Sequence, residues 1–206
     1  MSNQIDFSLY LITDRKQVHQ NHNLFSMVEA ALKGGVKAIQ LREKDLSIEQ
    51  LLPLAQQLRQ LTLRYQAKLL INTQIDIALA VDADGVHLGG DAPPIERARQ
   101  RLGPNKLIGV STHHQDEILQ AAQDGADFVS FSPIYFTPSK AEYGAPQGVQ
   151  ALKEICAKAP IPVFALGGIS VERQAEVLKA GAHGVALISA ICAATDSEQA
   201  ARAFLA

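Results

Sequence analysis

The sequence lacks several features that would place it in a specialised class of protein. It contains only two cysteines, Cys156 and Cys192, which lie in apolar stretches at no spacing typical of metal ligands. We therefore expect buried free thiols in a reducing compartment. No apolar run approaches the ~20 residues of a membrane span, and the first residues do not have the pattern of a signal peptide. A cytoplasmic protein without a membrane partner is expected.

An excess of charge of one sign is also missing. The chain has 19 Lys and Arg residues against 21 Asp and Glu residues, a formal net charge of −2. This balance argues against a nucleic-acid partner bound through a broad cationic face, while a local basic pocket stays compatible with it. The 206 residues, of which 47% are hydrophobic, are typical of an ordinary globular protein, and we expect a single domain over residues 1–206.

The sequence does contain a regular alternation of short apolar runs and helix-length amphipathic segments. The runs predict strands at 8–13, 38–41, 68–71, 85–88, 107–111, 128–131, 162–166 and 184–188. The segments predict helices near 24–33, 47–66, 74–81, 94–102, 114–124, 148–158, 171–180 and 189–205. The strands do not alternate between apolar and polar residues, which is typical of parallel strands that are covered on both faces.

A repeated pattern supports this assignment. The segments 34–41, 83–88, 125–131 and 181–187 each place a Gly or an Asp at the end of a helix, followed by a buried strand. They fall on the second, fourth, sixth and eighth strands, so the pattern predicts an α/β fold of the closed (β/α)8 barrel type. A doubly wound open sheet is the alternative, but it usually has fewer strands, and the G-x-G-x-x-G dinucleotide loop is absent.

In such a barrel the active site lies at the carboxyl ends of the strands. Gly167 and Gly168 follow the seventh strand and Ser189 follows the eighth. Backbone N–H groups of these loops and of a helix start could bind a phosphate there. A tight turn with Ser189 as a helix N-cap is the simpler alternative.

Gln40, Arg42 and Lys44 alternate along the end of the second strand, so their side chains should share one direction. If they point inward, two cations and an amide converge above the barrel, which suits an anionic substrate. Because Glu43 and Asp45 are interleaved with them, a solvated run of charges is the alternative.

Three further features follow or lie within strands. Thr137, Ser139 and Lys140 could hold a second anionic group or form a plain exposed turn. His113 directly follows the fifth strand and is a candidate for moving protons near neutral pH, whereas His87 is expected to be a satisfied residue of the barrel interior. No pair of histidines is placed like a zinc site.

Two acids, Asp14 and Asp91, are expected at strand ends without a neighbouring base that explains them. Mg²⁺ sites use one or two carboxylates together with substrate phosphates, so Asp91 could serve such a site alone. A loop acid or N-cap before Pro93 and Pro94 is the simpler interpretation of Asp91.

Seven segments in order over nearly the whole chain resemble one known family. They are QLREK at 40–44, IN at 71–72, ADGVHLG at 83–89, GVSTH at 109–113, SPIYFTPSK at 132–140, LGGI at 166–169 and ISAI at 188–191. Together they are similar to the thiamine phosphate synthase / TenI family. The LGGI loop occurs in several barrel families, whereas its combination with QLREK and GVSTH is specific.

The resemblance implies one of two activities. The synthases of the family join a pyrimidine methyl diphosphate to a thiazole phosphate and release diphosphate, with Mg²⁺. The TenI branch holds the same thiazole phosphate and aromatises its carboxylated precursor by proton transfer, without a cofactor. Both imply a small-molecule phosphate substrate.

The resemblance also implies site residues. For substrate binding they are Gln40, Arg42, Lys44, Asn72, Ser111, Thr137, Ser139 and Lys140; for phosphate binding, Gly167, Gly168, Ile188 and Ser189; and for proton transfer, His113.

At two positions this sequence departs from the pattern of the synthases, and this difference distinguishes the two branches of the family. Synthases carry Asn-Asp after the third strand and Gly-Gln-x-Asp after the fourth, and these acids hold the Mg²⁺. Here Thr73 and Ala92 stand at those positions, and Asp91 lies one residue early, with its side chain expected on the opposite side of the loop. We therefore expect no metal and a TenI-like thiazole tautomerase. The alternatives are a synthase whose Mg²⁺ is held differently, by Asp91 or Asp14, and a non-catalytic regulator that binds thiazole phosphate. Barrels of this kind often pair, so a homodimer is one expected state.

Overall fold

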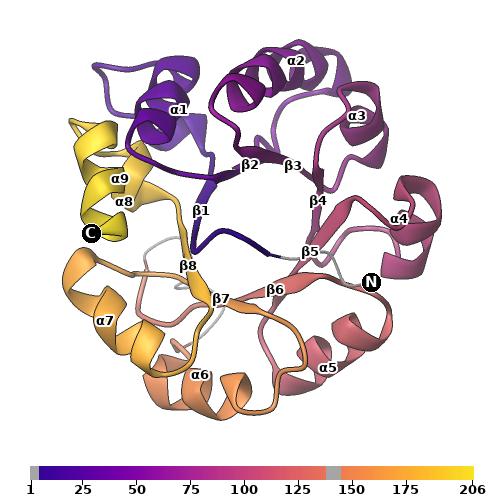
Figure 1. Cartoon of the computed structure of the whole chain (residues 1–206), viewed down its shortest axis with the longest axis vertical. Coiled ribbons are helices and arrows are strands. Elements are labelled where there is room, and N and C mark those ends of the chain that lie inside the picture. The colour runs from indigo at the N-terminus through magenta and orange to yellow at the C-terminus, as the bar shows by residue number, and fades with distance from the viewer. Residues whose placement is uncertain (1–4, 138–144) are drawn as a thin grey trace.

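The computed structural model describes residues 5–137 and 145–206 and confirms the predicted barrel. Eight parallel strands close in sequence order, and helices surround them (Figure 1). The strands are β1 (Leu9–Ile12), β2 (Ala38–Leu41), β3 (Lys68–Asn72), β4 (Gly85–Leu88), β5 (Leu107–Thr112), β6 (Phe128–Phe131), β7 (Val163–Leu166) and β8 (Gly184–Leu187). The helices are η1 (Arg15–Gln17, a 3-10 turn), α1 (Leu24–Lys33), α2 (Ile48–Arg64), α3 (Ile75–Ala80), α4 (Ile95–Leu102), α5 (Gln115–Gln123), α6 (Gly148–Cys156), α7 (Val171–Lys179), α8 (Ser189–Cys192) and α9 (Ser197–Leu205).

The prediction of one continuous helix over 189–205 is wrong, because the chain breaks it into α8 and α9. The Asp196 side chain accepts the Gln199 backbone N–H at 2.9 Å and so starts a new helix. The buried Ser197 hydroxyl donates to the Ile191 carbonyl at 3.0 Å, which ties the start of α9 to α8. The break leaves α8 as a single short turn whose start faces the carboxyl end of the barrel.

The repeated pattern before the even strands corresponds to a repeated turn. Gly125 and Gly181 have φ values of +94° and +101°, the left-handed region that favours glycine, and Asp82 takes the same region at +50° before β4. Beside two of these turns lies an ion pair, between Arg59 and Asp84 at 2.7 Å and between Arg99 and Asp127 at 2.6 Å. The same aspartate oxygens accept backbone N–H groups of β3 and β5, so each pair ties a helix to two neighbouring strands.

Two hydrophobic layers fill the molecule. The outer layer lies between the sheet and the helices, and the inner layer occupies the barrel axis. In the inner layer the Phe7 ring stacks on Phe164 with 5.2 Å between centroids and meets Phe128 edge-on at 5.8 Å. Because Phe7 precedes β1, these rings fill the amino end of the barrel and leave its carboxyl end for a ligand.

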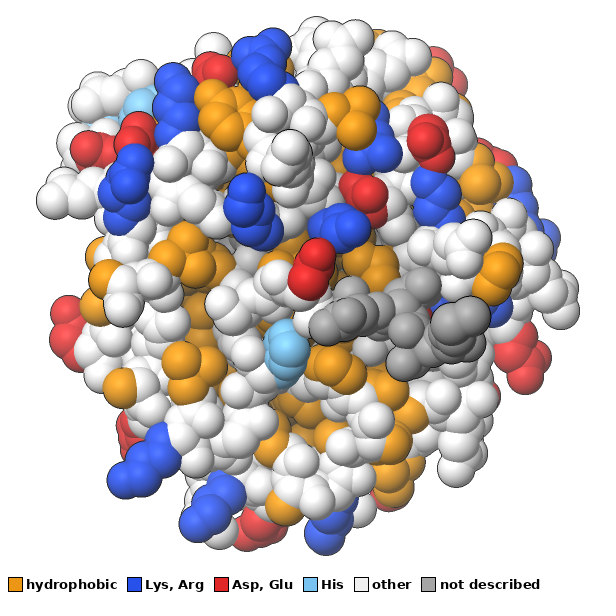
Figure 2. Space-filling model, viewed as in Figure 1, with side chains coloured by type: hydrophobic (Ala, Val, Ile, Leu, Met, Phe, Trp, Pro, Cys, Tyr) orange, Lys and Arg blue, Asp and Glu red, His pale blue; other side chains and the backbone are white. Residues whose placement is uncertain are grey.

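Residues 5–8, which precede β1, extend across the opening of the barrel in Figure 1. Figure 2, in the same view, shows basic and acidic side chains interspersed on that face. Both cysteines are free, and only Cys192 is fully buried, while Cys156 is half-buried. None of the helices in the described parts of the chain is long and apolar enough to cross a membrane.

Candidate active site

A cavity of about 440 Å³, the mouth cavity, opens at the carboxyl ends of the strands. It brings together seven of the binding and proton-transfer residues that the resemblance implies: Gln40, Arg42, Lys44, Asn72, Ser111, His113 and Ile188. The alternation along the second strand therefore does carry two cations and an amide to one place. Gln40 is buried, Arg42 is half-buried and Lys44 is exposed, so the three side chains run from the floor of the cavity to its rim.

A second cavity of about 480 Å³, the loop cavity, adjoins the first. Its lining includes five residues that the sequence analysis selected: Thr137, Gly167, Gly168, Ile188 and Ser189. Ser132, Leu166 and Ile188 line both cavities and form the wall between them. Two ligands bound in the two cavities would therefore be neighbours. Ser139 and Lys140 lie outside the described residues.

The Gly167–Gly168 turn needs glycine at both positions. Their φ values are +104° and +66°, and a Cβ atom would come within 2.9 Å of the Pro133 Cα at the first and of the Phe136 carbonyl at the second. Across the loop cavity, α8 begins at Ser189. The first N–H groups of a helix have no acceptor within it, so backbone donors and a hydroxyl are available at this wall.

The positions of Asp91 and Ala92 correct the sequence analysis. Asp91 lines the mouth cavity together with Thr73, whereas Ala92 lines a different hollow outside the barrel. The expectation that Asp91 lies away from this site was wrong, because a turn closed by the Ala92 N–H on the Gly89 carbonyl at 3.0 Å replaces the extended loop. Asp14, by contrast, caps η1 by accepting the Lys16 backbone N–H.

The family resemblance implies Mg²⁺, an ion that prefers oxygen ligands in near-octahedral geometry. The part of the chain that the structure describes has no group of three or more His, Cys, Asp or Glu side chains that could hold a metal alone. The cavity offers the Asp91 carboxylate, the Asn72 amide and the Thr73 hydroxyl. This set fits an Mg²⁺ ion whose remaining ligands are diphosphate oxygens and water, since Mg²⁺ is commonly held by one or two carboxylates with substrate phosphates.

Thr73 has an unusual backbone conformation for its side chain. Its φ is +62°, which is uncommon for any residue except glycine and costly for a β-branched one. The Thr73 N–H donates to the His87 carbonyl at 2.9 Å, and the Asn72 amide donates to the Thr73 hydroxyl at 3.3 Å. Asn and Asp tolerate this region better than Thr. The local backbone therefore suits the acid found at this position in synthases.

His113 lines the mouth cavity with one ring nitrogen already engaged. Its Nδ1 lies 2.7 Å from the Ser132 carbonyl oxygen, and a carbonyl only accepts, so Nδ1 carries a proton. The neutral ring then has an unprotonated Nε2. The His113 backbone N–H donates to Glu117, which fixes the loop after β5.

His87 is confirmed as a satisfied interior residue. Its ring contacts the hydroxyls of Tyr10, Ser111 and Ser130. Burial, with a smaller contribution from the nearby Arg42 charge, lowers the pKa of His87 to about 3. The imidazole is therefore neutral at physiological pH.

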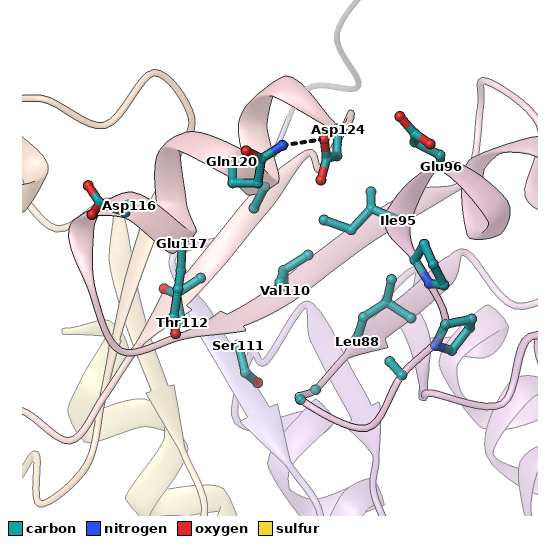
Figure 3. Close-up of a pocket in the computed structure, with 16 residues that line it drawn as sticks. Leu88, Ile95, Glu96, Val110, Ser111, Thr112, Asp116, Glu117, Gln120 and Asp124 are labelled. Atoms are coloured by element: carbon teal, nitrogen blue, oxygen red, sulfur yellow. Dashed lines mark hydrogen bonds between the residues drawn. The ribbon is translucent and has the colours of Figure 1, made fainter.

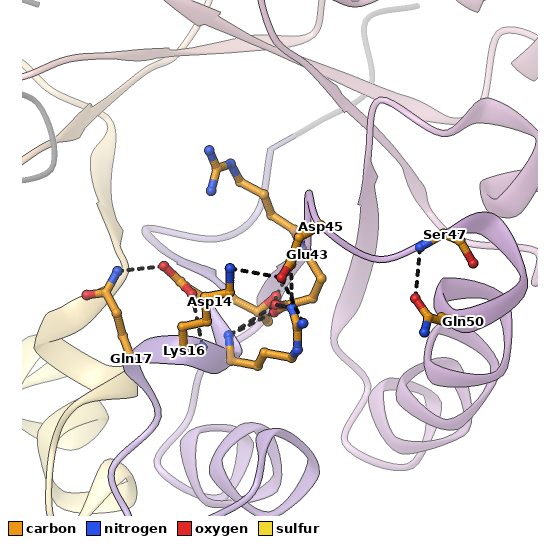
Figure 4. A network of polar contacts seen from close by, with 10 residues as sticks. Asp14, Lys16, Gln17, Glu43, Asp45, Ser47 and Gln50 are labelled. Atoms are coloured by element: carbon orange, nitrogen blue, oxygen red, sulfur yellow. Dashed lines mark hydrogen bonds and ion pairs between the residues drawn. The ribbon is translucent and has the colours of Figure 1, made fainter.

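Glu43 is a buried acid beside the mouth cavity whose contacts the sequence analysis did not predict. Its side chain is only 2% exposed and accepts hydrogen bonds from the Thr13 hydroxyl at 2.8 Å and from the Arg15 backbone N–H at 3.1 Å. Arg15 bridges it to Asp45 on the surface, and the Arg15 guanidinium holds the pKa of the Asp45 carboxyl well below its usual range. Figure 4 shows this network between the loops after β1 and β2. The alternative of a solvated charge run therefore holds for Asp45, which is exposed, but not for Glu43, which is buried.

A larger hollow of about 680 Å³ lies outside the barrel between α4 and α5 (Figure 3). Leu88, Ile95 and Val110 line it with apolar surface. Its charged lining residues are all acidic: Glu96, Asp116, Glu117 and Asp124. Carboxylates repel phosphorylated ligands, so the two smaller cavities at the strand ends are the better site for such molecules despite their size.

A (β/α)8 barrel with cations and a glycine loop at its carboxyl end is typical of enzymes that act on phosphorylated small molecules. Residues 9–191 match the model of the thiamine monophosphate synthase family, and the chain belongs to that family. It is 54% identical to the putative thiamine-phosphate synthase of Geobacter sulfurreducens over 98% of this chain and 95% of that protein. It is 43% identical to the thiamine-phosphate synthase of Chloroflexus aurantiacus, over 96% and 91% of the two chains.

Among solved structures, the fold superposes on the thiamine phosphate pyrophosphorylase from Pyrococcus furiosus with a TM-score of 0.87 and 38% identity, covering 97% of this chain and 94% of that one. These relatives support an enzyme of thiamine biosynthesis. Their names favour the synthase, which the sequence analysis held as the alternative, over the tautomerase.

Proposed function

We propose that the protein is a thiamine-phosphate synthase, which joins a pyrimidine methyl diphosphate to a thiazole phosphate and releases diphosphate. The observation that carries this proposal is the pair of adjoining cavities, because a two-substrate reaction needs two anion sites that share a wall. The names of the relatives support the same activity. Holding both reactants in contact replaces a bimolecular encounter by a step within one complex, which alone can supply several kcal/mol.

Each cavity has a role in this proposal. In the mouth cavity, Arg42 and Lys44 bind the diphosphate, and the buried Gln40 amide lies on the side of the pyrimidine. In the loop cavity, the Gly167–Gly168 backbone and the Ser189 hydroxyl bind the thiazole phosphate. Ile188 lines both cavities, so the two substrates would lie on either side of it.

Asp91, Asn72 and Thr73 would hold an Mg²⁺ ion that enters with the diphosphate. When bound, this ion would neutralise the charge that develops on the leaving diphosphate oxygens. The protein's own part is to aim one carboxylate and two neutral oxygens at that place, while Arg42 and Lys44 carry the rest of the positive charge.

Thiazole tautomerisation is the second candidate, and two observations favour it. Thr73 offers only a neutral hydroxyl where synthases have an acid, and His113 lines the mouth cavity with its Nδ1 held by the Ser132 carbonyl, which leaves Nε2 as the nitrogen that could exchange a proton with a ligand. In this reaction Arg42 or Lys44 would bind the carboxylate, and His113 would move a proton from the ring carbon to the exocyclic carbon. General acid–base work of about 10²–10⁴-fold suffices for a step driven by aromaticity.

One assay separates the candidates. Purified protein is incubated with the pyrimidine methyl diphosphate and the thiazole phosphate, with Mg²⁺ or with a chelator, and in parallel with the carboxylated thiazole precursor. Formation of thiamine phosphate and diphosphate in equal amounts, faster with Mg²⁺, is expected. Aromatisation of the precursor without formation of thiamine phosphate would identify the protein as the tautomerase. In that case His113→Gln should lower the rate of tautomerisation by about 10²-fold or more. If neither product forms, both candidate enzyme functions are contradicted, and a regulator that binds thiazole phosphate is favoured.

A matched pair of variants ties activity to the mouth cavity. Arg42→Gln removes a cation that lines the cavity and should slow the reaction by about tenfold or more, the share of one charged hydrogen bond. Arg64→Gln removes an equally charged side chain at the carboxyl end of α2, which lines neither cavity, and should leave the rate unchanged.

A further inference from the structure

A chain of polar side chains runs through the barrel interior to the mouth cavity. The Gln40 Nε2 donates to the Tyr10 hydroxyl at 3.1 Å, and that hydroxyl lies 3.4 Å from the His87 Nδ1. On the other side of the ring, the His87 Nε2 lies 3.1 Å from the Ser111 hydroxyl and 3.3 Å from that of Ser130. Ser111 lines the mouth cavity, so the chain connects the core to the place where substrate would bind.

The direction of the hydrogen bonds follows from the chemistry of the members. Burial raises the pKa of the Tyr10 phenol well above its usual range, so Tyr10 keeps its proton and must donate it. Since the hydroxyl already receives the Gln40 amide proton, the acceptor for its own proton is the His87 Nδ1. A neutral imidazole carries one proton, which therefore lies on Nε2.

The tautomer of His87 sets the direction of the Ser111 hydroxyl. The His87 Nε2–H donates to the serine oxygen, so the hydroxyl cannot give its own proton to the ring. That proton is left for an acceptor in the mouth cavity. With the other tautomer, Ser111 would instead donate to the ring and present only lone pairs to the ligand, which would repel an anion.

The ring position of His87 is tightly fixed. A Cβ atom on Gly109 would lie 2.6 Å from the His87 Nδ1 and 2.4 Å from the Phe128 Cζ, so the absence of a side chain at 109 makes room for the imidazole. Below the ring, Phe128 packs on both His87 and Tyr10. The imidazole therefore has no space to rotate away from its two partners.

We propose that Tyr10 and His87 are positioning residues that hold the Ser111 hydroxyl as a hydrogen-bond donor toward an anionic group of the bound substrate. The role in turnover rests on the proposed function, whereas the tautomer of His87 does not. A fixed donor that needs no reorientation during the reaction stabilises developing negative charge, and a single donor of this kind can contribute 10²–10³-fold.

The first test reads the tautomer directly. Imidazole ¹⁵N spectra of the full-length protein should show His87 protonated at Nε2, and Tyr10→Phe, which keeps the ring but removes the donor, should populate the Nδ1–H form. Tyr65→Phe is the matched control, because Tyr65 donates to Glu29 outside the barrel and should leave the His87 signals unchanged. An Nδ1–H tautomer in the unmodified protein would overturn the proposal.

The second test is a double-mutant cycle. Ser111→Ala should lower kcat by about 10²-fold and Tyr10→Phe by about tenfold, with smaller changes in KM, and Tyr10→Phe should have little further effect in the Ser111→Ala background. If Tyr10→Phe lowers kcat by the same factor with and without Ser111→Ala, Tyr10 does not act through Ser111. If the unmodified protein makes no thiamine phosphate, the proposed function fails, and the same cycle is read from the dissociation constant of inorganic diphosphate.

Discussion

The Thr13 hydroxyl donates to the buried Glu43 carboxylate at 2.8 Å and accepts the Arg42 backbone N–H at 3.0 Å. One side chain thereby joins the loop after β1 to the loop after β2. Because Arg42 carries one of the two cations that line the mouth cavity, Glu43 helps to position, through Thr13, a residue that we propose binds substrate.

We expect Glu43→Gln to destabilise the protein by about 2 kcal/mol, since an amide group cannot accept all of the hydrogen bonds that the carboxylate accepts and leaves a buried donor unpaired. Urea unfolding measures this change. Asp45→Asn is the matched control, because Asp45 binds the same Arg15 at the surface, where solvent screens the ion pair, and its loss should destabilise the protein clearly less. Equal effects of the two substitutions would contradict a special role for the buried carboxylate.

We expect Gly168→Ala to weaken binding of inorganic phosphate by about tenfold or more, because the new Cβ would meet the Tyr135 Cβ at 2.8 Å and the Phe136 carbonyl at 2.9 Å. The loop must then move its N–H groups. Gly103→Ala is the matched control: its φ is also positive, at +76°, but its Cβ would meet nothing within 4 Å. Calorimetric titration should show unchanged phosphate affinity for the control, and a parallel loss in both would refute the assignment of the pocket.

Features that depend on neighbouring residues could be predicted from the sequence, whereas features that depend on distant residues could not. The eight strands and the Gly167–Gly168 turn were predictable, because apolar runs and a Gly-Gly pair act through neighbouring residues. The role of Glu43 was not, since its partners Thr13 and Arg15 lie about thirty residues away. The place of Asp91 in the mouth cavity depends on the turn at Gly89–Gly90, whose geometry cannot be predicted from residue type alone.

We expect Thr73→Asp to tighten binding of Mg²⁺-diphosphate by about tenfold, the effect of roughly 1.4 kcal/mol from a second carboxylate in the mouth cavity. The left-handed backbone at residue 73 accepts Asp at least as well as Thr. Thr73→Asn controls for the backbone, and Ala92→Asp controls for added charge, since residue 92 lines the outer hollow. The same gain from Ala92→Asp in calorimetry would show that the gain does not come from the mouth cavity.

We expect the free energy of unfolding to fall as the pH drops below about 6.5, partly because of His87. Its pKa is about 3 in the folded protein and 6.5 ordinarily, so between these values the unfolded chain binds one proton more. Stability from this group is therefore present above pH 6.5 and is lost toward pH 3, by up to about 1.4 kcal/mol per pH unit.

Chemical denaturation at a series of pH values tests this slope. His87→Gln should flatten it, whereas His114→Gln, at an exposed position where α5 begins, should not. An unchanged slope in His87→Gln would mean that the imidazole is not held neutral in the folded protein.

The most direct test of the two-cavity site is a crystal structure of the protein with thiazole phosphate and Mg²⁺-diphosphate. The thiazole phosphate should lie against Gly167, Gly168 and Ser189, and the diphosphate should lie against Arg42 and Lys44, with the two ligands in contact beside Ile188. Both anions bound elsewhere, with the mouth and loop cavities empty, would contradict the assignment.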